Sequence, residues 1–265
     1  MKKGLDGDRA MTRRFCDEIL CERAPALAIM WLSEPDYTGH HAPLGSPEHR
    51  AAIAGADECV REVMQTVRRL DPAGERILLV VGSDHGMETI GRTIDLDTLL
   101  IEAGLKAGAG SSDVVVAPNG TAATLYFASP ESDLVERVAR FLAAEDWIGR
   151  VFAGPALAAV GLPTDTPMRI AATLATEARE NPYGIAGYSA IVRDSLEPKE
   201  CTGFGQHGGL GPHEQRPFLM VAGGGFVPGR HNSPTSLIDL APTVLRHLHM
   251  DHDDMDGCAL PRSLD

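Results

Sequence analysis

The stretch Arg76-Ile-Leu-Leu-Val-Val-Gly82, followed at once by Ser-Asp84-His85-Gly-Met87, decides the fold class. Its unbroken apolar run predicts a strand that is buried on both faces, as in a parallel sheet covered by helices. The run from Pro47 to Leu70 before it has helical character, and Ser46 suits its N-cap. Residues 26–32 predict another buried strand upstream. Strands and helices that alternate in this way indicate an α/β fold.

The remaining elements are expected on both sides of this stretch. Residues 8–23 have apolar positions at helical spacing and predict an amphipathic helix. Farther on, the patterns predict a hairpin over 113–128, a helix over 131–144 and a strand over 148–152, which together suggest a strand-rich insertion within 104–200. A last buried strand is expected at 216–222 and a closing helix at 235–248. We expect residues 1–265 to form a single domain.

Composition narrows the possible functions. The chain has 265 residues, a formal net charge of −13 and 43% apolar residues. A chain this acidic has no basic surplus with which to bind a nucleic-acid polymer. Five cysteines without a Cys-x-x-Cys pair indicate reduced thiols and a cytoplasmic location. The longest apolar runs have strand length, so no membrane-spanning segment is expected.

Three clusters of metal-ligand residue types follow or precede predicted strands. The first contains Asp36 and His40, four residues apart across a glycine. The second contains Asp84 and His85, between Gly82 and Gly86, which allow the chain to bend as it leaves the strand. The third is His207, which lies in the glycine-rich segment Gly203-Phe-Gly-Gln-His207-Gly-Gly. Loops of this kind gather at the carboxyl edge of a parallel sheet, where sites usually form.

Carboxylate oxygen and imidazole nitrogen together suit zinc, manganese or iron. Each cluster also has a simpler interpretation. Asp36 and His40 could form an exposed polar loop, Asp84 could cap a helix, and His207 could lie on a surface loop. The histidines and aspartates near the C-terminus lack the spacing of a calcium loop and are interpreted as a solvated tail: His247, His249, His252, Asp251, Asp253 and Asp254.

Taken in order, the motifs Glu34-Pro-Asp-Tyr-Thr-Gly-His40, Ser83-Asp-His-Gly-Met87 and Gln206-His-Gly resemble the type I phosphodiesterase/nucleotide pyrophosphatase family. The closing stretch from Ser236 to Thr243 is also similar to the C-terminal end of that family. The resemblance implies an alkaline phosphatase-like fold with a largely parallel central sheet and helices on both faces.

The resemblance also implies a site with two divalent metal ions, zinc in the first place and manganese or iron as alternatives. One metal would be held by Asp36, His40 and His207. The other would be held by Asp84, His85 and an aspartate nearer the N-terminus of the family's proteins. The family's nucleophile is a Thr or Ser beside that aspartate, so we expect it upstream of Met1 and interpret the chain as a C-terminal portion.

The function expected from this resemblance is metal-dependent hydrolysis of a phosphodiester or nucleotide pyrophosphate, with a small-molecule phosphoester as substrate. Phosphonoacetate hydrolase, phosphomonoesterase and sulfatase activities of the same superfamily stay open. A different class of function is a non-catalytic or degenerate metal-binding fragment. A third possibility is that a partner chain supplies the missing strand and nucleophile.

Overall fold

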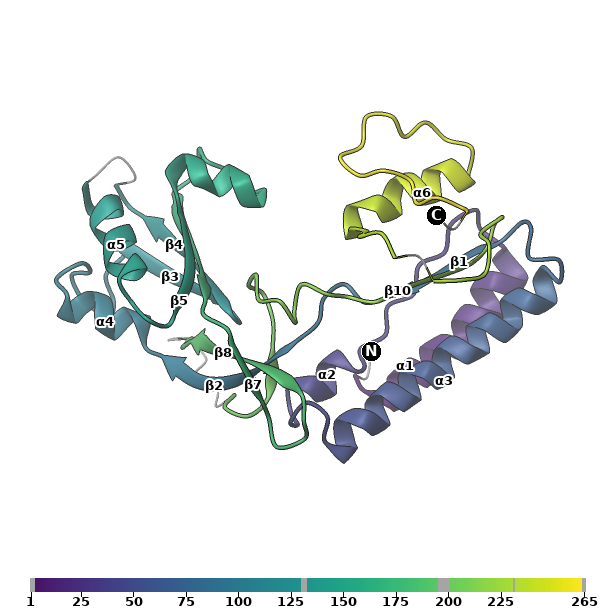
Figure 1. Ribbon diagram of the computed structural model, residues 1–265, viewed down its shortest axis with the longest axis horizontal. Coiled ribbons are helices and arrows are strands. Elements are labelled where there is room, and N and C mark those ends of the chain that lie inside the picture. The colour runs from purple at the N-terminus through teal and green to yellow at the C-terminus, as the bar shows by residue number, and fades with distance from the viewer. Residues whose placement is uncertain (1–2, 130–132, 195–200, 231, 264–265) are drawn as a thin grey trace. The chain divides into compact units, whose positions relative to one another are not determined.

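The computed structural model describes residues 3–129, 133–194, 201–230 and 232–263. The chain divides into two compact units, drawn in Figure 1. The first comprises three segments: Met1–Tyr37, Ala51–Asp84 and Pro217–Asp265. The second comprises two: Thr38–Arg50 and His85–Arg216. The predicted insertion, 104–200, falls within the second unit as far as residue 194, and 195–200 lie outside the described residues. A single domain over 1–265 stays a prediction.

Two helical segments form much of the first unit. The expected helix over 8–23 is observed as α1 (Leu5–Arg14), continued by a π-helix, η1 (Phe15–Arg23). It packs against α3 (Pro47–Leu70), the predicted helix. A Cβ added at Gly55 of α3 would lie 2.3 Å from Leu5 Cδ2, so glycine allows the two helices to approach closely. In the first turn of α3, the Ser46 hydroxyl accepts a hydrogen bond from His49 N at 3.2 Å, which confirms the predicted cap.

The decisive apolar stretch forms β1 (Leu78–Gly82), which pairs antiparallel with β10 (Leu219–Gly223). The prediction of a doubly covered parallel strand at this point is therefore wrong. These two strands are the whole sheet of the first unit within the described residues. Phe218 and Met220 are each 54% exposed. An apolar run is buried only if other segments cover it, and the run itself does not specify those segments.

Residues 26–32 do not form the expected buried strand. The segment has no ladder pairing, and its side chains Leu27, Ile29 and Trp31 are 52%, 76% and 67% exposed. The predicted strand is therefore not observed, and the expectation of burial was also wrong.

The first sheet of the second unit has the order β7-β8-β2-β9. Its strands are β2 (Glu88–Ile94), β7 (Glu177–Glu180), β8 (Ala186–Val192) and β9 (Gly205–Gln206). Only the β2–β8 pair is parallel among these, and the pairs β2–β9 and β7–β8 are antiparallel. The sheet is mixed, and the described residues form no largely parallel central sheet. The strand β2 follows directly after the second motif, so it positions His85.

The second sheet of this unit is antiparallel throughout, with the order β3-β4-β6-β5. It contains the predicted hairpin, β3 (Val114–Asn119) and β4 (Ala122–Phe127), together with β5 (Ile148–Ala153) and β6 (Met168–Leu174). Helix α5 (Asp133–Ala143) packs against β5 and β6, beside the sheet in Figure 1. Residues 131 and 132 of the expected helix lie outside the described residues.

The core of the second unit lies between this sheet and its helices. It includes α4 (Leu96–Glu102), and a short 3-10 helix, η2 (Gly154–Val160), follows β5. Several large side chains in it have no exposed surface: Leu100, Leu125, Leu142, Val138 and Ile170. Burial of such side chains stabilises the unit by about 1.5–3 kcal/mol each. The unit therefore has its own core, which supports the loops described below.

The closing helix of the chain is observed as η3 (Leu237–Asp239) and α6 (Leu240–His247), both in the first unit. Ser236 and Asp239 form a capping box at its start. The Asp239 carboxylate also accepts a hydrogen bond from Cys258 N at 2.9 Å, which attaches the C-terminal segment. Among the helices of the described residues, none combines the length and apolar character required to cross a membrane.

Candidate metal centre

His40 follows a single turn of helix, α2 (Asp36–Gly39). Its Nδ1 lies 3.0 Å from the carbonyl oxygen of Gly205 in β9. A carbonyl oxygen can only accept, so Nδ1 carries the proton and donates it. In the neutral ring Nε2 is then the nitrogen with the lone pair. A hydrogen bond from the other ring nitrogen to a backbone carbonyl is the usual support of a metal-binding histidine.

His85 has the same arrangement in a different loop. Its Nδ1 lies 2.9 Å from the carbonyl oxygen of Gly86 and donates to it. The Gly86 N–H donates in turn to the carbonyl oxygen of Glu214 at 2.7 Å. Nε2 is again the lone-pair nitrogen of the neutral ring. Two of the predicted ligands therefore have the tautomer that suits coordination through Nε2.

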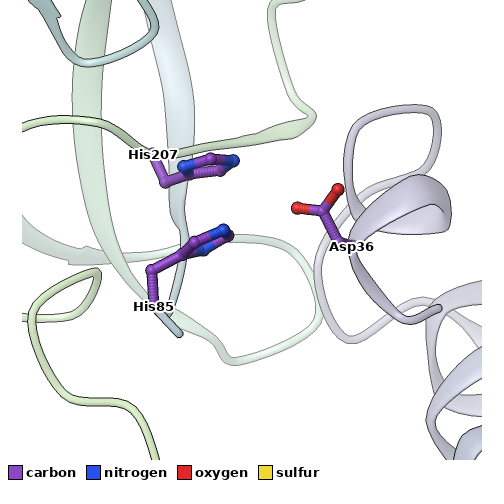
Figure 2. A group of neighbouring side chains, drawn as sticks. All are labelled: Asp36, His85 and His207. Atoms are coloured by element: carbon purple, nitrogen blue, oxygen red, sulfur yellow. The ribbon is translucent and has the colours of Figure 1, made fainter. Parts of the chain in front are cut away.

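The His207 ring lies close to the rings of both His85 and His40. It stacks on the ring of His85, with centroids 3.5 Å apart and planes at 16°. Its centroid lies 5.2 Å from that of His40. Ring nitrogens of His85 and His207 lie within 4.8 Å of each other. Figure 2 shows these two rings one above the other and also labels Asp36, which opens α2. The imidazole cluster, His40, His85 and His207, lies wholly in the second unit.

Met87 packs where the three motifs meet. A Cβ added at Gly39 of the first motif would lie 2.5 Å from Met87 Sδ, and one at Gly205, next to the third motif, would lie 2.8 Å from the same sulfur. Both distances are too short for a real side chain. The glycines therefore allow one methionine of the second motif to contact the other two loops. The three loops that carry the imidazoles are therefore in direct contact through Met87.

The two predicted aspartate ligands belong to the first unit. Asp36 is the first residue of α2 and precedes His40 by four residues in the chain. Asp84 follows the end of β1, where the Ser83 hydroxyl accepts a hydrogen bond from Phe218 N at 3.2 Å. Their roles as ligands stay predictions.

Three buried carboxylates support these loops, and the sequence analysis did not identify them. Asp8 lies in the first unit and is 2% exposed; Glu88 and Glu214 lie in the second and are 0% and 2% exposed. Asp8 accepts hydrogen bonds from Ser33 N and Glu34 N, both at 2.9 Å, just before the first motif. No spacing in the sequence distinguishes these acids from exposed ones, because each also binds a residue far away in the chain: Ser33 for Asp8, Thr176 for Glu88 and Thr121 for Glu214.

Burial raises the pKa of Glu88 above its ordinary value. Hydrogen bonds from the Thr176 hydroxyl at 3.0 Å and from His213 N at 3.3 Å act in the opposite direction. The nearby carboxylate of Glu214 raises the pKa further. Glu88 is therefore a carboxyl group whose charged form is disfavoured by its surroundings, three residues from His85.

The donor set fits divalent metal ions of the zinc type. Imidazole nitrogens are borderline ligands that zinc, manganese and iron accept, and the carbonyl partners of His40 and His85 are typical outer contacts of such sites. The net charge of −13 is compatible with bound cations that face an anionic substrate.

The described structure has an α/β fold that matches alkaline phosphatase-like proteins. It superposes on the alkaline phosphatase PafA with a TM-score of 0.64 and 17% identity, covering 99% of this chain and 53% of that one. It also superposes on murine ectonucleotide pyrophosphatase/phosphodiesterase 5, as an inactive variant in complex with AMP, with a TM-score of 0.68 and 18% identity, covering 94% of this chain and 61% of that one.

Residues 5–158 match the sequence profile of the type I phosphodiesterase/nucleotide pyrophosphatase family. The chain belongs to that family, whose members are phosphoric-ester hydrolases. Human ectonucleotide pyrophosphatase/phosphodiesterase family member 7 is 34% identical to it over 64 residues, which are 24% of this chain and 14% of that protein. The family resemblance inferred from the three motifs is confirmed. The chain spans between half and two thirds of the length of the two solved relatives described above.

Proposed function

We propose that this chain carries the metal-binding part of a two-metal centre that hydrolyses phosphoric esters. The observation that supports it best is the convergence of His40, His85 and His207 in one unit, in a member of this family. We assign Asp36, His40 and His207 to one metal, and Asp84 and His85 to the other. Two divalent cations would supply positive charge that activates an attacking hydroxyl and stabilises the leaving oxygen.

The residues of this chain would hold and orient the ligands. His40 and His85 each present Nε2, because Nδ1 donates to a backbone carbonyl at 3.0 and 2.9 Å. Fixed ring orientation lowers the entropy lost when a metal binds, as preorganised sites do. Zinc is the first choice of metal, with manganese or iron as alternatives.

A phosphodiester or nucleotide pyrophosphate is the substrate class that we propose. The AMP complex of the murine relative supports a nucleotide, and the net charge of −13 disfavours a long polyanion. We further propose that the attacking hydroxyl comes from polypeptide outside residues 1–265. The length of the solved relatives beyond the matched part supports this proposal.

The test is hydrolysis of bis-(p-nitrophenyl) phosphate by the full natural polypeptide with added zinc or manganese, with and without a chelator. We expect turnover that the chelator abolishes and that His207→Ala lowers by at least about 100-fold, since loss of an outer contact alone costs about 10- to 100-fold. Chelator-insensitive turnover, or none on phosphodiesters, phosphomonoesters or sulfates, would refute the proposal.

A second candidate is a metal-binding fragment without catalysis. It is favoured by the chain's coverage of only 53% and 61% of the two solved relatives. Calorimetric titration of residues 1–265 with zinc, combined with the hydrolysis assay, distinguishes the two candidate functions. Zinc binding that His207→Ala abolishes, together with an inert full polypeptide, would establish the second candidate in place of the first.

A further inference from the structure

We infer that Glu214 is the positioning residue that sets the separation of His85 and His207. The inference rests on the proposed function, in which both histidines bind metal. Glu214 is 2% exposed and lies in the second unit together with both rings. Glu214 holds the backbone of the two loops that carry these rings.

The side chain of Glu214 holds the loop that follows His207. Its Oε2 accepts a hydrogen bond from Gly209 N at 3.0 Å, and its Oε1 accepts one from Gly211 N at 2.8 Å. Hydrogen bonds to an ionised carboxylate are stronger than those between neutral groups. Two successive points of the glycine-rich loop are thereby attached to one buried group. Without it, a loop with glycines at 208, 209 and 211 would have wide conformational freedom.

The backbone of Glu214 holds the loop of His85. Its carbonyl oxygen accepts a hydrogen bond from Gly86 N at 2.7 Å, and the carbonyl of Gly86 accepts from His85 Nδ1 at 2.9 Å. A Cβ added at Gly86 would lie 2.1 Å from His213 O, so only glycine allows this approach. One residue is therefore hydrogen-bonded to both loops, and the loops carry rings whose centroids are 3.5 Å apart.

Thr121, at the tip of the β3–β4 hairpin, completes the arrangement. Its hydroxyl donates to Glu214 Oε2 at 2.7 Å and accepts from Gly209 N at 2.8 Å. Its own N–H donates to the carbonyl oxygen of His207 at 3.3 Å. The hairpin of the predicted insertion thus supports the third motif directly. Thr121 is 1% exposed, so water does not replace these contacts.

The substitution Glu214→Gln tests this inference, because it keeps the shape and replaces one acceptor oxygen by a donor NH₂ group. That group would face N–H and O–H donors and leave at least one of them unsatisfied. We expect loss of the nuclear Overhauser contacts between the His85 and His207 ring protons in the metal-free protein. We also expect Co²⁺ affinity to fall by about 10- to 100-fold, the usual effect of losing an outer contact.

Leu142→Ala is the matched control. Leu142 is fully buried in the hydrophobic core of the same unit. Its truncation therefore destabilises the unit through lost packing. We expect it to keep both the ring contacts and the Co²⁺ affinity. A Glu214→Gln variant that keeps both, or a Leu142→Ala variant that loses both equally, would overturn the inference.

Two variants at Thr121 keep the test decisive if Glu214→Gln does not fold. Thr121→Val removes the hydroxyl that links Glu214 to Gly209, whereas Thr121→Ser retains it. We expect Val to weaken the ring contacts and Ser to preserve them; equal behaviour of the two would count against the inference. A separate outcome is that the wild-type chain shows ring contacts that Glu214→Gln abolishes, and yet binds no Co²⁺. That result would support the positioning role of Glu214 and refute the proposed metal site.

Discussion

The imidazole rings of His85 and His207 stack with centroids 3.5 Å apart and planes within 16° of parallel. His85 lies in the loop that follows β1, and His207 lies in a glycine-rich loop far from it in the sequence. Both belong to the same compact unit. Their proximity, with His40 beside them, is the feature from which the proposed metal centre follows.

The first prediction concerns metal binding by the stacked pair. Either His85→Ala or His207→Ala is expected to weaken zinc binding by at least about 100-fold, because each removes a proposed imidazole ligand as well as a stacking partner. Isothermal titration of residues 1–265 with zinc measures the effect. His252→Ala, in the C-terminal segment, is the control and should bind as the wild type does. Equal weakening by all three variants would contradict the site.

The second prediction concerns Asp8, which holds the turn before the first motif. Its carboxylate accepts from Ser33 N at 2.9 Å, from the Ser33 hydroxyl at 3.0 Å and from Glu34 N at 2.9 Å. Asp8→Asn should lower the free energy of unfolding by about 1–3 kcal/mol, because the new amide cannot accept from all these donors. Urea denaturation measures it. Asp17→Asn, at an exposed position of η1, should change stability little.

The third prediction compares two glycines with left-handed backbone conformations. Gly120 has φ +57° and Gly104 has φ +64°. Alanine at either position should cost about 1–2 kcal/mol of stability for the backbone conformation alone. A Cβ at Gly120 would also lie 1.9 Å from His207 O, whereas one at Gly104 meets nothing within 4 Å.

Only Gly120→Ala should therefore also weaken zinc binding, because it displaces the backbone of a proposed ligand. Thermal unfolding and zinc titration of both variants provide the comparison. If Gly104→Ala lowers zinc affinity as much as Gly120→Ala does, the effect comes from general destabilisation, and the hairpin has no specific role at the third motif.

The fourth prediction concerns the pH dependence of stability due to Glu88. Burial raises the pKa of Glu88 in the folded state, so the unfolded state ionises first as the pH rises. The free energy of unfolding should therefore fall between the unfolded pKa, about 4.3, and the raised folded pKa, and stay lower above it. Glu88→Gln should remove this part of the pH dependence. Urea denaturation between pH 4 and 8 compares the two proteins, and identical profiles would contradict the assignment.

Sequence patterns predicted those elements whose cause is local. The helix α3 begins at its predicted position because Ser46 caps it, and the β3–β4 hairpin forms around Pro118-Asn-Gly120, whose last residue adopts a positive φ. The order and spacing of the three motifs were sufficient to identify the family. The residue types also indicated His40, His85 and His207 as candidate ligands, and these three imidazoles converge.

Pairing and burial were decided by tertiary structure. The apolar stretch of β1 pairs antiparallel with β10, and Ile29 and Trp31 are exposed, although both segments have the composition of buried strands. The contribution of Glu214 could not be predicted either, since its partners, Gly86, Gly209 and Thr121, come from three separate segments. Local patterns determine backbone conformation and ligand type. Which distant groups meet depends on long-range packing, because no residue's own neighbours in the chain specify it.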